Sequence, residues 1–350
     1  MQLLSKEGAE VKILSFDREY YSGKLFFEDY ISLGSIEHGN YLKRLLPFLK
    51  SLRTIRTNIK NSDVIYCFGL DTFLLGWLAS KFISSSPKLV YEVGDIRKIL
   101  TKDKLMSKIL RVIQKFLTRK ADLLAVTSED YVTGYFENML GLSDLNYKVM
   151  ENKIAKNEMP VYQNDKKITD ENILKIGYFG VLRCPKSWEI LKKIAIQSKG
   201  KIEIVLRGIP RGIKDFYETL EKVPNIIYNG EYKSPDDLPE MYTNVDLVWA
   251  CYPYQREEVG NWRWARTTRF YEACYFKRPL ITQDNTADSR VVEEYNIGAT
   301  VSLERTEETA NRVLNISTEE IQKWYNNLYE LPEEICVYTD EHRQLYERLK

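Results

Sequence analysis

Two stretches in the second half of the sequence carry residues that could hold a phosphorylated ligand. The first runs from Lys175 to Lys186 (KIGYFGVLRCPK) and is typical of a strand that ends at Gly180 and leads through a short basic loop into a helix. Glycine allows a close backbone turn around a ligand, and a helix N-terminus offers unpaired N–H groups to a phosphate. Arg183 and Lys186 would add positive charge there. Many α/β proteins, however, use such a glycine only to close the turn.

The second stretch, Asn261 to Thr282 (NWRWARTTRFYEACYFKRPLIT), predicts a helix, a tight turn and a buried strand. Glu272 falls on this helix, next to apolar positions that would face a core. A carboxylate at this point could accept hydrogen bonds from two ribose hydroxyls. The alternative is that Glu272 is a solvated helix residue.

Taken together, the two stretches resemble the donor-binding domain of GT-B glycosyltransferases of the family-four type. In those enzymes a first strand that ends in glycine, with Arg and Lys after it, receives the donor pyrophosphate. A helix with the motif N-R/K-x-Y-E-A, followed by G-x-P-L/V-I, holds the ribose. The matching segments of the second half are 268–273 (TRFYEA), 277–281 (KRPLI), 229–232 (NGEY) and 238–247 (LPEMYTNVDL). Those of the first half are 62–66 (SDVIY), 88–96 (KLVYEVGDI) and 121–123 (ADL), so the likeness covers nearly the whole chain.

The resemblance implies that the second domain binds a nucleotide sugar and the first domain binds the acceptor. Arg183, Lys186 and Arg207 would neutralise the leaving diphosphate, a task that other glycosyltransferase folds give to a metal, so no metal is expected. The remaining residues expected to bind the donor are Gly180, Arg269, Glu272 and Thr286.

Two departures from the family pattern leave the stereochemical outcome of the transfer open. Retaining members often have a histidine where this chain has Gly94. Relatives with two glutamates eight positions apart would have the first at Trp264, and here only the second, Glu272, is present.

A group that orients or deprotonates the acceptor hydroxyl is also needed. Asp95 follows the predicted strand 89–93 and is the best placed carboxylate, unless it caps a helix over 96–100. Asp71 follows the predicted strand 64–68 in the same way and could cap a helix or contact a sugar.

The composition limits the chemistry to carboxylates, cationic side chains and oriented backbone. The chain has only His38 and His342, which excludes a multi-histidine metal site. Its five cysteines are odd in number and form no C-x-x-C pair, so they are predicted to be reduced thiols. The longest apolar stretch, 72–79, is far short of the roughly 20 residues that span a bilayer. We therefore expect a cytoplasmic protein, free or peripheral on the inner face of the membrane.

Short β-branched and aromatic runs alternate with amphipathic stretches, which predicts an α/β protein with two facing Rossmann-like, doubly wound domains. The expected domains are 1–154 for the acceptor and 173–316 for the donor, joined by a polar linker over 155–172. C-terminal helices over 317–350 are expected to pack across both domains. The predicted strands are 11–16, 64–68, 89–93, 123–127, 147–150, 173–179, 202–206, 226–228, 247–249, 280–282 and 299–301.

The first domain is expected to lack its first strand. Residues 3–16 are typical of the last turn of a helix, a glycine C-cap and a strand. The resembling family has a strand and most of a helix ahead of this point. An upstream extension of roughly 20 residues, or a sheet rebuilt around the gap, is therefore expected.

Positive charge is concentrated in the first half. Residues 41–120 contain 17 Lys and Arg against 5 Asp and Glu, a net charge of +12, although the whole chain carries only +1. One helical stripe is formed by Lys104, Lys108, Arg111, Lys115 and Arg119. The opposite arc is apolar and is expected to cover a sheet; it holds Leu105, Met106, Ile109, Leu110, Val112, Ile113, Phe116 and Leu117. The basic stripe either contacts anionic lipid or is a solvated face.

The function that fits best is transfer of a sugar from a nucleotide sugar to a hydroxyl of a glycan or lipid-linked saccharide, without a metal, as in polysaccharide biosynthesis. Two alternatives stay open: a GT-B enzyme that does not transfer, such as a nucleotide-sugar epimerase, and a decayed module that binds membrane or nucleic acid. Aromatic residues are not interleaved with the basic stripe, which argues against nucleic acid.

Overall fold

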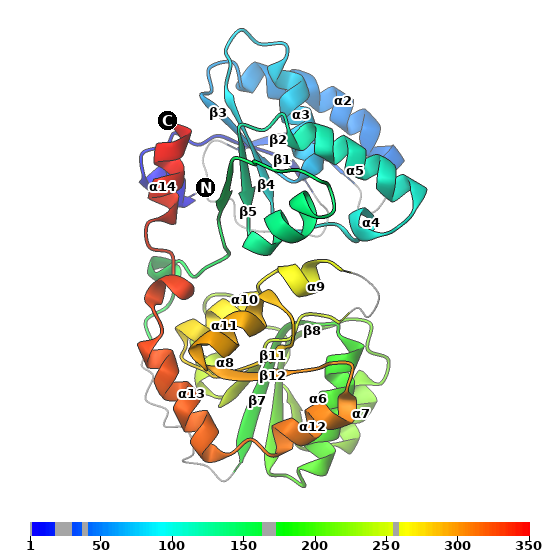
Figure 1. Ribbon diagram of the computed structural model, residues 1–350, viewed down its shortest axis with the longest axis vertical. Helices are drawn as coiled ribbons and strands as arrows, with labels where there is room; N and C mark the ends of the chain where they lie inside the picture. The colour runs from blue at the N-terminus through cyan, green and yellow to red at the C-terminus, as the bar shows by residue number, and fades with distance from the viewer. Residues whose placement is uncertain (1, 18–29, 37–40, 163–172, 255–258) are drawn as a thin grey trace. The chain divides into compact units, whose positions relative to one another are not determined.

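The chain divides into two compact units in the computed structural model, which describes residues 2–17, 30–36, 41–162, 173–254 and 259–350. The first unit comprises Met1–Met150 and Thr339–Lys350, and the second comprises Glu151–Tyr338 (Figure 1). Residues 151–154 thus belong to the second unit. His38 lies outside the described residues.

The second unit is built on a parallel sheet of six strands in the order β12-β11-β10-β7-β8-β9. All six predicted strands of this half are present. β7 and β8 extend three and four residues further than predicted. The strands are β7 (Leu174–Leu182), β8 (Ile202–Pro210), β9 (Ile226–Tyr228), β10 (Leu247–Trp249), β11 (Leu280–Gln283) and β12 (Gly298–Val301).

Helices cover both faces of this sheet, because its strands are apolar on both sides. One face is covered by α6 (Pro185–Gln197), α7 (Phe216–Lys222) and α12 (Thr306–Leu314). The other is covered by α8 (Leu238–Thr243), α10 (Thr268–Tyr275) and α11 (Ala287–Tyr295) (Figure 1). The short helix α9 (Asn261–Trp264) precedes α10.

The described part of the predicted linker, 155–162, packs within the second unit. The Tyr162 hydroxyl donates a hydrogen bond to the Tyr275 carbonyl oxygen at 3.0 Å, and its ring lies 4.7 Å from that of Phe276. The C-terminal segment is shared between the two units. Helix α13 (Thr318–Glu330) buries Trp324 and Leu328 in the second unit, whereas α14 (Glu341–Leu349) buries Leu345 in the first.

The first unit contains a parallel sheet in the order β3-β4-β5-β6 and a separate parallel pair, β1-β2. The predicted helix end, glycine C-cap and strand at the start of the chain are confirmed by α1, by Gly8 at φ +101° and by β1. β2 was not predicted. The strands are β1 (Ile13–Asp17), β2 (Tyr30–Ser35), β3 (Val64–Phe68), β4 (Lys88–Val93), β5 (Leu123–Val126) and β6 (Tyr147–Val149). The helices are α1 (Gln2–Lys6), α2 (Tyr41–Asn58), α3 (Leu70–Ser80), α4 (Lys98–Thr101), α5 (Leu105–Thr118), a π-helix (Tyr131–Glu137) and α14.

Helix α5 contacts its own unit through a face that we did not predict. The expected apolar contact face is largely exposed, and of its eight residues Leu117 is the one that is buried. The other buried residues of the helix are Ser107, Gln114 and Thr118. Gln114 explains this orientation, because its amide donates to the Tyr91 hydroxyl at 3.0 Å and accepts from Tyr135 at 2.6 Å, all within the interior.

All five cysteines are buried and none forms a disulfide in the structure, and their reduced state stays a prediction. Cys67 lies in the first unit, and Cys184, Cys251, Cys274 and Cys336 lie in the second. Among the described residues, no helix combines the length and apolar character needed to cross a bilayer.

Candidate functional site

Gly180 lies inside β7 and not at its end, so the predicted strand boundary is wrong. The strand continues to Leu182 because Gly180 and Gly208 stand side by side in β7 and β8, at φ +99° and +126°. A Cβ on Gly208 would lie 1.9 Å from the Gly180 carbonyl oxygen, which only glycine permits. Two glycines thus shape the backbone near the carboxyl ends of these strands, where ligands bind in open α/β sheets.

Arg269, on α10, lies close to this backbone. Its Nη1 donates to the Phe179 carbonyl oxygen at 2.7 Å, and its Nη2 donates to the Cys251 carbonyl oxygen at 2.8 Å. A methyl group on Gly180 would lie 3.6 Å from Nη1 of Arg269 and 3.8 Å from the Tyr232 hydroxyl. The guanidinium therefore joins the ends of β7 and β10 at a single point.

Glu272, one turn along α10 from Arg269, is buried and not solvated. Its Oε2 accepts a hydrogen bond from the Tyr242 hydroxyl at 2.5 Å. Burial raises the pKa of Glu272 to about 7, against the opposing effects of this hydrogen bond and of Arg269. A buried carboxylate with a raised pKa is typical of a functional site and would accept hydrogen bonds from ligand hydroxyls.

A second buried carboxylate, Asp288 on α11, fixes the start of α10. It accepts hydrogen bonds from the backbone N–H of Thr267 at 3.1 Å and from its hydroxyl at 2.8 Å. Thr267 in turn caps α10, because its Oγ1 accepts from the Phe270 N–H at 3.1 Å. Burial raises the pKa of Asp288 to about 7. We did not predict Asp288, although the Thr267 cap is a visible sequence signal for the helix start.

Arg207 lies at the same end of the sheet, on β8. Its Nη2 donates to the Glu231 carbonyl oxygen at 3.0 Å and lies 3.3 Å from Oδ2 of Asp237. The Nε–H groups of Arg207 and Arg269 are buried and have no hydrogen-bond partner among the described residues. Two buried cationic donors without a full set of partners favour an anionic ligand at this edge of the sheet.

Arg183 and Lys186 follow β7 at the start of α6. Cys184 is the N-cap of this helix, since its Sγ accepts from the Ser187 N–H at 3.4 Å, and Pro185 occupies the first helical position. Arg183 is exposed and lies 6.0 Å from the centre of the Tyr252 ring, and Lys186 forms an ion pair with Glu189 at 3.1 Å. Their side chains can reorient toward a ligand because both are exposed or half-buried.

Thr286 forms the N-cap of α11 in a capping box with Ser289. Its hydroxyl is buried, donates to the Gln283 carbonyl oxygen at 2.8 Å and accepts from the Ser289 N–H at 3.1 Å. The residue therefore already has a structural role in α11, and its binding of the donor stays a prediction.

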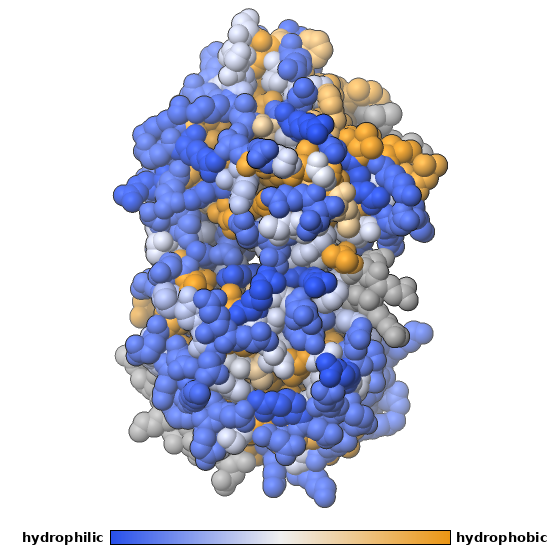
Figure 2. Space-filling view, viewed as in Figure 1, coloured by the Kyte–Doolittle hydropathy of each residue, from blue (hydrophilic) through white to orange (hydrophobic). Residues whose placement is uncertain are grey.

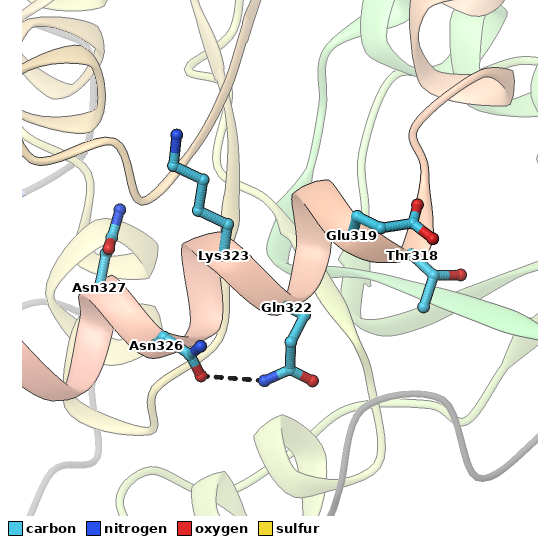
Figure 3. Close-up of a pocket in the computed structure, with 6 residues that line it drawn as sticks. All are labelled: Thr318, Glu319, Gln322, Lys323, Asn326 and Asn327. Atoms are coloured by element: carbon cyan, nitrogen blue, oxygen red, sulfur yellow. Dashed lines mark hydrogen bonds between the residues drawn. The ribbon is translucent and has the colours of Figure 1, made fainter.

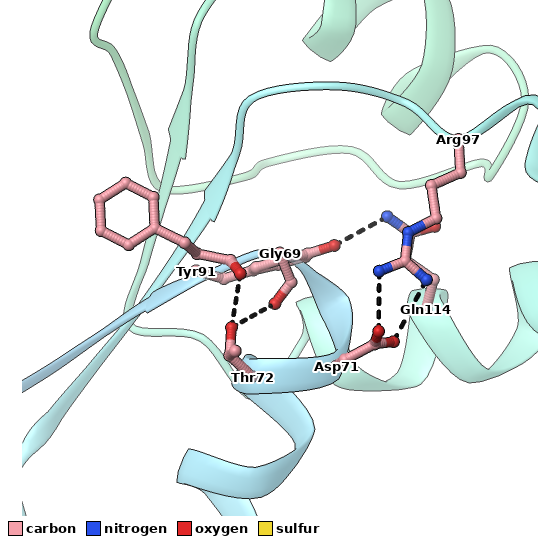
Figure 4. Close-up of polar contacts among 7 residues, drawn as sticks. Gly69, Asp71, Thr72, Tyr91, Arg97 and Gln114 are labelled. Atoms are coloured by element: carbon pink, nitrogen blue, oxygen red, sulfur yellow. Dashed lines mark hydrogen bonds and ion pairs between the residues drawn. The ribbon is translucent and has the colours of Figure 1, made fainter. Parts of the chain in front are cut away.

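In the first unit, Asp95 is exposed just after β4, and α4 begins at Lys98 with Arg97 as its N-cap. Asp95 is therefore not the N-cap of that helix. Asp71 lies in the first turn of α3, where its carboxylate binds the Arg97 guanidinium at 2.8 and 3.3 Å (Figure 4). This pair joins the first turn of α3 to the loop between β4 and α4.

A surface hollow elsewhere in the second unit is separate from these residues. Figure 3 shows that its lining comes from a single helix, α13, and includes Gln322 hydrogen-bonded to Asn326 at 2.9 Å. None of the residues expected to bind donor or acceptor lines it.

The chain resembles a known protein in sequence and several solved structures in fold. No family model matches the chain. It is 27% identical over 277 residues to the succinoglycan biosynthesis protein ExoL of Rhizobium meliloti, covering 77% of this chain and 68% of ExoL.

Two solved structures illustrate the likeness in fold. Anabaena HepE in complex with UDP superposes with a TM-score of 0.70 at 18% identity, over 91% of this chain and 85% of HepE. Sucrose-phosphate synthase of Thermosynechococcus elongatus superposes with a TM-score of 0.75 at 12% identity, over 99% of this chain and 90% of that enzyme. The chain therefore has the GT-B glycosyltransferase fold, built from two Rossmann-like domains, and is a distant homologue of ExoL.

Proposed function

We propose that this protein is a glycosyltransferase that moves a sugar from a UDP-sugar to a hydroxyl of a growing glycan or lipid-linked saccharide. The observation that carries the proposal is the convergence of Gly180, Arg269 and Glu272 at the carboxyl ends of the strands in the second unit. HepE, which shares the fold, has been solved with UDP and with UDP-glucose. The name of ExoL points to polysaccharide biosynthesis.

Each group at this edge of the sheet suits one part of such a donor. The Glu272 carboxylate would accept hydrogen bonds from the ribose hydroxyls. Arg207 and Arg269 would direct their buried Nε–H groups and their charge at the diphosphate. Arg183 and Lys186 would approach as the sugar departs, stabilising the charge that grows on the leaving diphosphate. With four cations near the diphosphate, the proposed reaction uses no metal.

The acceptor side of the proposal rests on the first unit. Asp95 is exposed just past β4 and would orient or deprotonate the attacking hydroxyl. The ion pair of Asp71 with Arg97 would hold the start of α3 and the loop after β4 in place. Attack of that hydroxyl oxygen on the anomeric carbon forms the new glycosidic bond, and the bond to the diphosphate breaks.

Thermal unfolding with a panel of nucleotides and nucleotide sugars tests the donor. A ligand present at about 100 times its Kd raises the free energy of unfolding by about 2.7 kcal/mol, which gives a readable rise in Tm. We expect UDP and one UDP-sugar to raise Tm, and Glu272→Gln to reduce the rise. Glu240→Gln, on the exposed surface of α8, is the matched control.

If no nucleotide or nucleotide sugar in the panel raises Tm, the proposal is wrong. Conversion of a UDP-sugar to its epimer, without an acceptor, would instead assign the site to an epimerase.

A further inference from the structure

Helix α5 presents an apolar face to solvent. This face, called here the α5 apolar face, consists of Leu105, Met106, Ile109, Val112, Ile113 and Phe116, all of them exposed. Leu105 and Val112 expose 77% and 68% of their surface. At 100° per residue the six side chains fall within an arc of about 120°. Figure 2 shows the apolar patch over α5 on this side of the molecule.

Polar contacts fix the opposite face of the helix against the first unit. The orientation of α5 therefore keeps the α5 apolar face exposed. Gln114 is buried and hydrogen-bonded to Tyr91 and Tyr135, and Figure 4 shows it reaching the Tyr91 hydroxyl. Arg111 also ties the helix down, because its Nη1 donates to the carbonyl oxygens of Leu100 and Lys102 at 2.9 Å. Rotating the helix to bury its apolar face would leave these groups without partners, at a cost in stability.

Cations border the α5 apolar face, and no acidic residue occurs within α5 itself. Lys104, Lys108, Arg119 and Lys120 are exposed around it. Lys120 places its Nζ 5.2 Å from the Phe116 ring centre. Of the five residues of the predicted basic stripe, Arg111 and Lys115 instead donate to backbone carbonyl oxygens. Asp103, which precedes the helix, pairs with Lys108 at 2.9 Å.

We infer that the α5 apolar face inserts into the interfacial region of an anionic lipid bilayer. A helix with one strongly apolar face and a basic border lies in the membrane plane, with its apolar side chains among the acyl chains and its cations at the headgroups. The charge of the surrounding segment is complementary to anionic lipid, since residues 41–120 carry a net +12 in a chain of net +1. The inference concerns a surface and does not depend on the proposed reaction.

This differs from the membrane contact expected from the sequence. The sequence predicted that the basic stripe alone contacts the lipid and that the apolar arc covers a sheet. Here the apolar side chains supply the binding and the cations supply the preference for anionic headgroups. Binding should therefore fall only in part as salt is raised, because salt screens charge but does not weaken apolar burial.

Co-sedimentation of the full chain with vesicles tests the inference. We expect binding to mixed phosphatidylcholine and phosphatidylglycerol vesicles, and weaker binding to phosphatidylcholine alone. The variant Leu105→Ser/Val112→Ser should bind both on the order of tenfold or more weakly, because it removes two side chains from the acyl region. Val161→Ser/Ile196→Ser is the matched control, since both of its positions are exposed apolar residues of the second unit.

Charge is tested separately with Lys104→Gln/Arg119→Gln. Each removed charge should weaken binding to the anionic vesicles about fivefold, and binding to the neutral vesicles should not change.

A fluorescent probe gives a second readout that does not rely on affinity. The five native cysteines are buried, so a thiol reagent should label Val112→Cys selectively. A polarity-sensitive dye there should shift to shorter wavelength on anionic vesicles, whereas the same dye at Ile196→Cys should not.

Three results would overturn the inference. The first is an absence of binding to either vesicle, and the second is unchanged binding of Leu105→Ser/Val112→Ser. The third is a dimer in sedimentation velocity that this variant dissociates, without vesicle binding. That last result would assign the α5 apolar face to a second copy of the chain.

Discussion

The hydroxyl of Tyr242 on α8 donates a hydrogen bond to Oε2 of Glu272 on α10, and the two atoms are 2.5 Å apart. Both side chains are buried, and the hydrogen bond holds one of the two carboxylate oxygens of Glu272. Glu272 lies one helical turn from Arg269 on α10. The pair fixes the position of the group that is proposed to bind the ribose.

Glu272→Gln is expected to weaken binding of the active UDP-sugar about tenfold to a hundredfold. The reason is that hydrogen bonds to a charged acceptor are worth about 1.5 to 3 kcal/mol. Tyr242→Phe should have a smaller effect, because it keeps the carboxylate and removes only the group that positions it. Isothermal titration of both variants checks this, with Glu240→Gln as the control. Equal affinities for wild type and Glu272→Gln would remove Glu272 from the site.

Binding of the UDP-sugar should strengthen as pH rises toward about 7 and then level off. Burial raises the pKa of Glu272 to about 7, and ribose hydroxyls that donate to the ionised form would favour that form. Below about pH 7 the affinity should fall up to tenfold per pH unit. The measurement should use a UDP-sugar and not UDP, because the terminal phosphate of UDP itself titrates near neutral pH. The profile should be flat in Glu272→Gln, and a flat wild-type profile would contradict the assignment.

The same raised pKa values predict a pH dependence of stability. In the unfolded chain Glu272 and Asp288 ionise near 4.5 and 3.8, whereas in the fold both hold their protons to about 7. The folded state therefore binds more protons in this window, so their contribution to stability falls as pH rises through it and is constant above it. Glu272→Gln and Asp288→Asn should each make the free energy of unfolding less dependent on pH between about 4.5 and 7.

Gly208→Ala should destabilise the second unit more than Gly200→Ala. Both positions have positive φ, a backbone conformation that alanine rarely adopts. At Gly200 a Cβ meets open space, whereas at Gly208 it would lie 1.9 Å from the Gly180 carbonyl oxygen. Urea unfolding of the two variants measures the additional cost at Gly208. Equal midpoints would mean that β7 can move away from β8 at no cost.

Arg183→Gln/Lys186→Gln should lower kcat about a hundredfold and raise KM less. The basis is that these side chains are proposed to meet charge that develops only as the donor bond breaks. Lys199→Gln/Lys201→Gln, near the other end of α6, removes the same charge from exposed positions and serves as the control. A raised KM with normal kcat would restrict the pair to binding of the donor ground state.

Much of the fold could be predicted from the sequence, because short β-branched runs between amphipathic stretches mark parallel strands well. Strands over Val64–Phe68, Ile226–Tyr228 and Leu247–Trp249 were predicted with their observed bounds. The sequence did not predict that β7 and β8 continue past Gly180 and Gly208. Glycines at positive φ usually end a strand, and the close approach of these two backbones has no signature in either segment alone.

The contact face of α5 shows a different limit. A helical wheel identifies the apolar, basic and polar sides, but it cannot say which side meets the protein when a buried glutamine has partners on distant strands and helices. Tyr91 and Tyr135, which hold Gln114, lie 23 and 21 residues away from it. Similarly, the sequence alone did not decide whether Glu272 binds a ligand or is a solvated helix residue. Its burial depends on Tyr242, which is 30 residues earlier in the chain.

The distribution of thiols gives the protein a built-in reporter of how it opens. Burial raises the pKa of Cys67 to about 12 and that of Cys336 to about 11, so each thiol is almost entirely protonated and unreactive until its surroundings unfold. Opening of the first unit would release one thiol, and opening of the second would release four. The stoichiometry of labelling during slow denaturation would therefore reveal which half of the chain unfolds first and whether the two halves unfold together.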